Sequence, residues 1–398
     1  MSPDPDHSVK NAVIFSQHTW KGLREAGFHA IGRSLLSSGF DVCFATQPIT
    51  LSFVLGRIAE GGLSASRELK RGIRYQENAA TLTNFSEIDL TLPGPLRNLA
   101  PNFFRLSAER KLVARAAKQF PTASVLVIES SRLVHHWAYI KQRFPNAPLV
   151  YRPSDPIYAR DDRPESLKQN ERDLVATADL VLCVNQQAKE YFAALPGVSA
   201  SKIAVLPNGI HLDGFQNRTP PTPNREPTFA YIGASAPNWT VIFNACRRYP
   251  EFRFKVICPV RPSNTLMREI QYLTNLTFIP GIPPEEVPEQ VLSSDVIMAV
   301  YPENCKNWAR GGHAKLYQAI AARKPTIGLN AGQGSTPFLS IDCQSADEFC
   351  DKLPQAINSD PPSLTLIDGL TWKKFEEVFA HHIEQLLSNS SLKNDSEQ

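Results

Sequence analysis

The sequence predicts an α/β protein built from two doubly wound, Rossmann-like domains. Short apolar runs rich in β-branched residues alternate with helical segments along most of the chain, a pattern typical of parallel sheets. The chain has 398 residues, more than a single hydrophobic core usually supports. Residues 217–227 hold four prolines and show no periodicity, so they are the best candidate for a linker. We therefore expect two domains that face each other across a ligand cleft.

The first series of elements opens with a strand at 11–16, a loop and helix within 22–38, and a strand at 41–45. Residues 51–92 mix basic and apolar side chains without a clear period, and no element is assigned there. Further elements then alternate regularly: helices at 103–120, 135–144, 165–177 and 187–195, and strands at 124–129, 148–152, 180–184 and 203–206.

The second series predicts strands at 228–232, 254–258, 276–279, 295–300 and 326–329, and helices at 313–323, 345–358 and 371–387. Ser345-Ala346-Asp347-Glu348 is a capping box that opens the second of these helices. We place the first domain at 1–216 and the second at 217–371, and expect a C-terminal helix at 372–388 to pack back on the first. The polar tail beyond it is expected to be disordered.

Composition and missing motifs exclude several functions. The net charge of +3 is too small to argue for nucleic acid, and the seven cysteines show no metal-ligand spacing. The chain lacks GxSxG, HExxH and Walker motifs, which removes support for hydrolase, zinc-protease and NTPase functions. No signal peptide and no apolar run of about 20 residues is found, which favours a cytoplasmic protein. We expect no metal and no cofactor.

The segment 295–330 is the strongest candidate for a binding site. It predicts a strand, a polar loop ending in Gly311-Gly312, and a helix that carries Lys315 and Gln318 on one face. Uncovered N–H groups at such a helix start bind phosphate readily. The alternative, at roughly even odds, is a surface lysine on an ordinary α/β helix.

Loops that follow other predicted strands add further candidates. Gly233-Ala234-Ser235 allows close approach of a phosphate or of another backbone, but it is not GxGxxG, so a nicotinamide enzyme is disfavoured. Gly281-Ile282-Pro283 also follows a strand, where an ordinary turn is the simpler explanation. Asp155 is a possible general base, although Asp is also a standard turn residue. His18 and Arg24 follow the first strand and either contact an acceptor or are simply exposed.

The helix predicted at 103–120 carries five basic residues against one Glu. A basic amphipathic helix can lie on an anionic bilayer. An ordinary domain helix with a solvated basic face is the alternative, and it is the commoner outcome for such charge runs.

Four local motifs, in order, are similar to one known family. They are VIFSQHTW with the helix after it, VIES followed by RFPNAPLVYRPSD, FAYIGAS, and YPE followed by HAKLYQ. Together they resemble GT-B glycosyltransferases, most closely the glucuronosyltransferases of glycosyltransferase family 70. The resemblance runs from about residue 11 to residue 371 and is weakest between 46 and 122. LPNGIHLDGF, at 206–215, is a broader GT-B signature.

The resemblance implies a role for each matching residue. Asp155 corresponds to the candidate catalytic base, and His18 and Arg24 lie on the acceptor side. The matched donor-side positions are Lys315 on the diphosphate, Gln318 on the same helix face, Tyr301, Gly233 and the loop Gly281-Ile282-Pro283. Ala234, Ser235, Ile282 and Pro283 depart from the family pattern at the nucleotide. Arg310 is a candidate partner for a sugar carboxylate, because a guanidinium matches that geometry.

The function expected from the resemblance is inverting, metal-independent transfer of glucuronate from UDP-glucuronate. The acceptor would be a polyprenyl-linked oligosaccharide in bacterial exopolysaccharide synthesis, at the inner face of the plasma membrane. Two alternatives stay open: a GT-B transferase that uses another UDP- or GDP-sugar, and a non-catalytic protein that binds nucleotide sugars.

Overall fold

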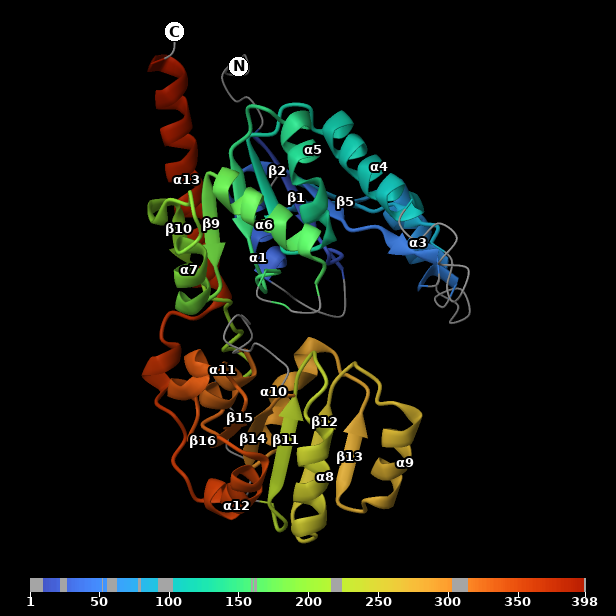
Figure 1. Ribbon diagram of the computed structural model, residues 1–398, viewed down its shortest axis with the longest axis vertical. Coiled ribbons are helices and arrows are strands. Elements are labelled where there is room, and N and C mark those ends of the chain that lie inside the picture. The colour runs from blue at the N-terminus through green and yellow to red at the C-terminus, as the bar shows by residue number, and fades with distance from the viewer. Residues whose placement is uncertain are drawn as a thin grey trace. The chain divides into compact units, whose positions relative to one another are not determined.

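The computed structural model describes residues 10–21, 27–51, 53–55, 63–77, 80–91, 103–158, 160, 163–215, 224–302 and 314–396. The chain forms two compact units. The first comprises Met1–Leu206 together with Phe375–Gln398, and the second comprises Pro207–Lys374. Each unit contains its own sheet with helices on both faces, as expected for doubly wound domains (Figure 1).

The sheet of the first unit has the strand order β10-β9-β8-β7-β1-β2-β5-β4. Its strands in chain order are β1 (Lys10–Ser16), β2 (Phe40–Thr46), β4 (Ile73–Glu77), β5 (Ala80–Phe85), β7 (Val125–Glu129), β8 (Leu149–Arg152), β9 (Leu180–Cys183) and β10 (Ile203–Val205). The pairing of β1 with β7 aligns Phe15 with Ile128, so Ser16 and Glu129 end adjacent strands. A separate short pair joins β3 (Ile49–Thr50) to β6 (Ile88–Asp89).

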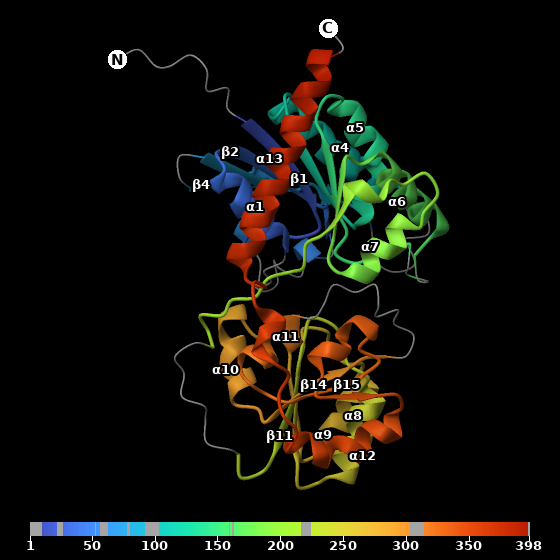
Figure 2. The ribbon, with the colours of Figure 1, turned by 90° about the vertical axis from the view of Figure 1, so that its left-hand side faces the viewer.

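Helices cover the two faces of this sheet because successive strand residues point to opposite sides. Val13 and Phe15 of β1 pack in one core with apolar residues of α4 (Phe103–Gln119), α5 (Trp137–Arg143), α6 (Glu165–Thr177) and α7 (Gln186–Ala193). On the other face lie α1 (Gly27–Ser37) and α13 (Trp372–Ser396), side by side (Figure 2). Arg33 Nε of α1 contacts Glu376 Oε1 of α13 at 2.7 Å.

Part of the first unit differs from the expected all-parallel sheet. Residues 51–92, to which no element was assigned, hold α3 (Leu63–Arg71) and the strands β4 and β5. β5 pairs in parallel with β2, but β4 pairs antiparallel with β5 and closes the edge of the sheet. The parallel pattern therefore breaks at the edge, because a tight β4–β5 connection can only join antiparallel neighbours.

The sheet of the second unit has the order β13-β12-β11-β14-β15-β16, and all of its pairings are parallel. Its strands are β11 (Thr228–Ile232), β12 (Arg253–Ile257), β13 (Leu276–Ile279), β14 (Val296–Val300), β15 (Thr326–Leu329) and β16 (Ile341–Cys343). Its helices are α8 (Trp239–Arg248), α9 (Asn264–Tyr272), α10 (Val287–Leu292), α11 (Ala314–Ala321) and α12 (Ala346–Ile357). Ser345 Oγ caps α12 by accepting from the Glu348 N–H at 3.1 Å.

The boundary between the units lies earlier than residue 216, where the sequence pattern put it. Residues 207–215 belong to the second unit, since Ile210 bridges to Thr371 and packs with Tyr317 and Ile367. The last helix also extends to Ser396, so the tail expected to be disordered is helical through that residue. Once a helix has formed, each further residue adds one backbone hydrogen bond, which favours continuation through a polar stretch.

In each sheet the chain first adds strands on one side of the first strand and then crosses to the other side. In the first unit this switch point lies between β1 and β7, and in the second it lies between β11 and β14. Ligands of open α/β sheets bind beyond the carboxyl ends of the strands at these points. Ser16 and Glu129 end the strands at the first point, and Ile232 and Val300 end them at the second.

Candidate functional site

Lys315 lies at the carboxyl edge of the second sheet. It is the second residue of α11, whose Leu316, Ala319 and Ile320 are buried in the core. Its Nζ lies 3.6 Å from the ring centroid of Tyr231 and 4.6 Å from that of Tyr301. Tyr231 precedes the last residue of β11 and Tyr301 follows β14, so the ammonium lies at the switch point. Lys315 is only 9% exposed, which rules out the surface-lysine alternative.

Gly233 makes room for this ammonium. It directly follows β11, and its N–H donates to the Ile257 carbonyl at 3.0 Å. A Cβ at this position would lie 2.8 Å from Lys315 Nζ and 3.3 Å from the Tyr231 hydroxyl. The groups nearest this glycine are the side chains of Lys315 and Tyr231, not another backbone, and the predicted approach of a phosphate stays a prediction. Ala234 next to it is exposed.

The other donor-side candidates lie along the same edge. The Tyr231 hydroxyl donates to the Ser235 carbonyl at 3.0 Å and ties down the loop after β11. Gly281 lies in the loop after β13, two strands from β11. Its φ of +84° is typical of an ordinary turn glycine. Ile282 packs against the core and Pro283 precedes a 3₁₀ turn. Gln318 is half-buried on α11.

Four of the residues named in the predictions lie outside the described part of the chain. They are Arg310, the Gly311-Gly312 pair and Arg24. The expected phosphate-binding start of the helix, the sugar-carboxylate partner and one acceptor-side arginine therefore stay predictions.

Glu129 organises the corresponding edge of the first sheet. Its side chain is fully buried at the end of β7. Oε2 accepts from Ser16 Oγ at 2.6 Å and from the Gln17 N–H at 2.9 Å. Oε1 accepts from Ser154 Oγ at 3.1 Å and lies 3.4 Å from His18 Nε2. One carboxylate thus joins the loop after β1 to the loop after β8.

The ionisation of Glu129 reflects these contacts. Burial alone would raise the pKa of its carboxyl, but hydrogen bonds from His18, Ser16 and the Gln17 N–H together hold the pKa below its usual range. A buried carboxylate that accepts several hydrogen bonds stays charged. The charge is therefore a fixed feature of this edge.

His18 is anchored through its backbone as well as its ring. Its N–H donates to Ser16 Oγ at 3.0 Å, and its carbonyl accepts from Thr46 Oγ1 at 2.8 Å. The side chain is 24% exposed. Thr46 Oγ1 in turn accepts from buried Asn84 at 2.8 Å. Residues from β1, β2, β5 and β7 therefore hold the His18 loop in place.

Asp155 lies in the loop directly after β8 and is half-buried. The N–H groups of Asp155 and Ser154 both donate to Ser130 Oγ, at 3.2 and 2.9 Å. The structure thus brings the His18 and Asp155 loops together at Glu129 and Ser130, the end of β7.

A second buried carboxylate, Glu171 of α6, anchors the far side of the Asp155 loop. It accepts from the N–H groups of Ile157 and Tyr158, at 2.9 and 2.5 Å, and from the Tyr151 hydroxyl. Burial raises the pKa of Glu171 to about 7 against the opposing effect of these hydrogen bonds. The sequence analysis did not identify Glu129, Glu171 or Tyr231 as site residues. Only Glu129 had a signal in the sequence, because it is an acid at the end of the buried strand in the motif VIES.

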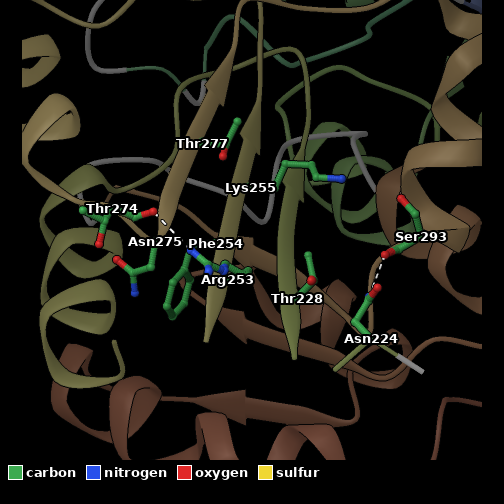
Figure 3. Close-up of a pocket in the computed structure, with 9 residues that line it drawn as sticks. All are labelled: Asn224, Thr228, Arg253, Phe254, Lys255, Thr274, Asn275, Thr277 and Ser293. Carbon is green, nitrogen blue, oxygen red and sulfur yellow. Dashed lines mark hydrogen bonds between the residues drawn. The ribbon is translucent and has the colours of Figure 1, made fainter. Parts of the chain in front are cut away.

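Other features of the structure lie away from these edges. A pocket of about 330 Å³ is lined by Thr228 and Arg253, the first residues of β11 and β12, so it opens at the amino edge of the sheet (Figure 3). Among the described residues, no cluster of three or more His, Cys, Asp or Glu side chains is arranged to hold a metal ion. Within the same part of the chain, no helix is both long and apolar enough to cross a bilayer.

Comparison with protein families gives one match. Residues 14–184 match the model of the N-terminal domain of glucuronosyltransferase GumK. This range contains His18, Glu129 and Asp155 and ends with β9. No curated protein sequence matches the chain.

Comparison with solved structures extends over nearly the whole chain. Sucrose-phosphate synthase from Thermosynechococcus elongatus has a TM-score of 0.61 at 13% identity, covering 97% of this chain and 98% of its own. Anabaena HepE in complex with UDP and glucose has a TM-score of 0.59 at 12% identity, with coverages of 96% and 99%. An E. coli trehalose-6-phosphate protein bound with UDP-2-fluoro glucose has a TM-score of 0.62 at 13% identity, with coverages of 96% and 99%.

These comparisons confirm the expected resemblance and the expected fold class. The identities are low, so the structural likeness establishes architecture: the chain has the GT-B fold of two Rossmann-like domains. The family match adds that its residues 14–184 are related to GumK.

Proposed function

We propose that this protein is an inverting, metal-independent glycosyltransferase that moves glucuronate from UDP-glucuronate to a lipid-linked oligosaccharide. The relation to GumK supports the sugar, and the neighbours solved with UDP or a UDP-sugar support the nucleotide. The single observation that carries the proposal is the Lys315 ammonium, which lies between Tyr231 and Tyr301 at the switch point of the second sheet.

The donor would bind at this edge of the second unit. An ammonium fixed beside the strand ends is suited to a diphosphate that gains negative charge as it leaves. The two tyrosine faces hold the ammonium by cation–π attraction, each contact being worth about 0.5–2 kcal/mol. In the proposed role, Lys315 stabilises the diphosphate, while Gln318, Gly233 and the loops at Ala234-Ser235 and Gly281-Ile282-Pro283 surround the nucleotide.

The acceptor would bind at the equivalent edge of the first unit. Asp155 takes the proton of the acceptor hydroxyl as its oxygen attacks the anomeric carbon. The bond from that carbon to the diphosphate oxygen breaks, and its electron pair leaves with UDP. One attack from the face opposite the leaving group inverts the anomeric centre. General base catalysis of this kind contributes roughly 10²–10⁴-fold.

The experiment measures release of the nucleoside diphosphate, UDP or GDP, from a panel of UDP- and GDP-sugars with a polyprenyl-linked oligosaccharide acceptor. We expect UDP-glucuronate to give turnover, and Asp155→Asn and Lys315→Ala each to lower kcat by roughly a hundredfold or more. Full activity of Asp155→Asn would remove Asp155 as the base, and full activity of Lys315→Ala would remove the diphosphate role.

Two alternatives, a different donor and a non-catalytic binding protein, predict other outcomes with the same nucleotide sugars. Turnover with a different nucleotide sugar would keep the fold and chemistry but replace the donor. A thermal shift with UDP-glucuronate, but no turnover with any lipid-linked acceptor, would identify a non-catalytic nucleotide-sugar-binding protein.

The lipid-linked acceptor also implies a membrane surface, and α4 has the composition for one. Phe103, Phe104 and Leu106 at its start are 70, 39 and 37% exposed. Its one acid, Glu109, is buried against His136, so the solvent-facing side of α4 is basic and apolar. Such a face can lie on anionic lipid, with the rings in the interface. We propose peripheral association with the cytoplasmic face of the plasma membrane.

A further inference from the structure

Glu129 is a fully buried carboxylate at the end of β7, in contact with the loops that carry His18 and Asp155. A buried carboxylate is expensive unless it is fully hydrogen-bonded, and here the Ser16, Gln17, Ser154 and His18 side chains and one backbone N–H surround it. Apart from Ser16, which ends β1, these partners belong to the two loops that carry His18 and Asp155. The charge of Glu129 can therefore influence how His18 and Asp155 are placed.

The contact with Glu129 selects one tautomer of a neutral His18. A neutral imidazole has one N–H and one lone pair, and a carboxylate accepts only from the N–H. In a neutral His18, the Nε2 atom that lies 3.4 Å from Glu129 Oε1 carries the N–H, so the lone pair lies on Nδ1. A carboxylate behind an imidazole also orients the ring. Nδ1 becomes a defined hydrogen-bond acceptor on a side chain that is 24% exposed.

We propose that Glu129 is a positioning residue that acts on the acceptor through His18. Its carboxylate holds His18 so that Nδ1 accepts a hydrogen bond from a hydroxyl of the acceptor sugar, next to the hydroxyl that Asp155 deprotonates. Ser154 Oγ donates to the same oxygen, Oε1, so the start of the Asp155 loop lies beside His18 at this carboxylate. The inference rests on the proposed function and adds that His18, held by Glu129, orients the acceptor sugar.

The test is a double-mutant cycle on kcat and on KM for the nucleotide sugar, with Glu129→Gln, His18→Gln and the double variant. We expect E129Q and H18Q each to lower kcat about 10–100-fold, the range seen when a supporting carboxylate behind a histidine is removed. The KM for the donor should stay within about twofold, because the donor contacts lie on the second unit. In the H18Q background, E129Q should lower kcat by less than about threefold, since residues that act as a unit are not additive.

Glu109→Gln is the matched control. Glu109 is also a buried carboxylate of the first unit, and it contacts a histidine in the same way, with His136 Nε2 2.9 Å from Oε2. It shares no contact with the His18 or Asp155 loop among the described residues. We expect E109Q to lower thermal stability as E129Q does, while folded E109Q keeps the kcat of the unchanged protein.

Several results would overturn the inference. An unchanged kcat in folded E129Q would do so, as would losses that multiply in the double variant. Should E129Q not fold, an unchanged kcat in H18Q alone overturns it. Asp155→Asn separates this failure from a failure of the proposed function: an inactive D155N beside a fully active E129Q removes only the role of Glu129.

Discussion

At the scale of the residue, the position of one ammonium group depends on the absence of one methyl group. Lys315 Nζ occupies space that a Cβ at Gly233 would enter, at 2.8 Å. The lysine is long and can shift, so the conflict is relieved by moving the ammonium away from the two tyrosine rings. Gly233 is therefore needed mainly to leave space for the Lys315 ammonium, and less for the conformation of the backbone.

Gly233→Ala is expected to lower kcat/KM for the nucleotide sugar by roughly a hundredfold, since a displacement of about 1 Å at a reacting centre can have this effect. Stability should change by less than about 1 kcal/mol, because the displaced group is a flexible side chain. Steady-state kinetics with thermal unfolding checks both. Asn244→Gln adds one methylene at an exposed position of α8 in the same unit and should leave both quantities unchanged; equal losses in the two variants would contradict this explanation.

At the scale of the element, the loop after β8 is held from both sides by buried carboxylates. Ser130 and Glu129 hold its beginning, and Glu171 of α6 holds Ile157 and Tyr158. The loop carries Asp155 between these anchors, so its geometry is fixed by α6 and β7 rather than by its own sequence.

Glu171 makes stability depend on pH. Its pKa is about 7 in the folded chain, raised by burial from 4.5. Between these values the folded state binds more protons than the unfolded state, so the free energy of unfolding falls as pH rises and levels off above pH 7. The full effect is at most roughly 3 kcal/mol. Chemical denaturation of the unchanged protein and Glu171→Gln from pH 5 to 8 should show this fall only when Glu171 is present.

Glu165→Gln on the same helix is the control for this pH dependence. Its side chain is 70% exposed and pairs with Arg172, an arrangement of little energetic consequence. E165Q should keep the pH dependence of the unchanged protein. A fall of equal size in E171Q would assign the pH dependence to another group.

Most elements were predictable because side-chain periodicity is a local property of the sequence. The strand at β11 and the helix α11 lie close to their predicted positions, and the capping box at Ser345 begins α12. Residues 51–92 were not predictable. β4 there, IRYQE, has no apolar run and gains its place only by pairing with β5 at the sheet edge.

At the scale of the whole molecule, the proposed association with a membrane surface can be tested directly. Besides the apolar residues at the start of α4, the first unit also exposes about half of each of the side chains of Phe53, Leu55 and Leu90. Phe103→Ser with Phe104→Ser should lower binding to vesicles of anionic lipid at least tenfold, since burying one such ring contributes about 1.5–3 kcal/mol. Co-sedimentation measures the bound fraction, and added salt should weaken binding.

The control for vesicle binding is Tyr272→Ser, at an 86% exposed aromatic residue on α9 of the second unit. It should bind vesicles like the unchanged protein. Equal binding to neutral phosphatidylcholine vesicles, or no loss in the double phenylalanine variant, would contradict an anionic membrane surface at α4.

The sequence by itself determined the alternation of strands and helices, the positions of Gly233, Tyr301 and Asp155 just beyond strand ends, and the position of Lys315 at the start of a helix. Spacing along the chain is enough for that. Only the tertiary structure decided that β11 adjoins β14 and that β1 adjoins β7, and so which strand ends meet. Tyr231 joins Lys315, and Glu129 joins His18 to Ser154, across 84, 111 and 25 residues of chain. Strand order depends on non-local pairing and burial, which no local pattern in the sequence records.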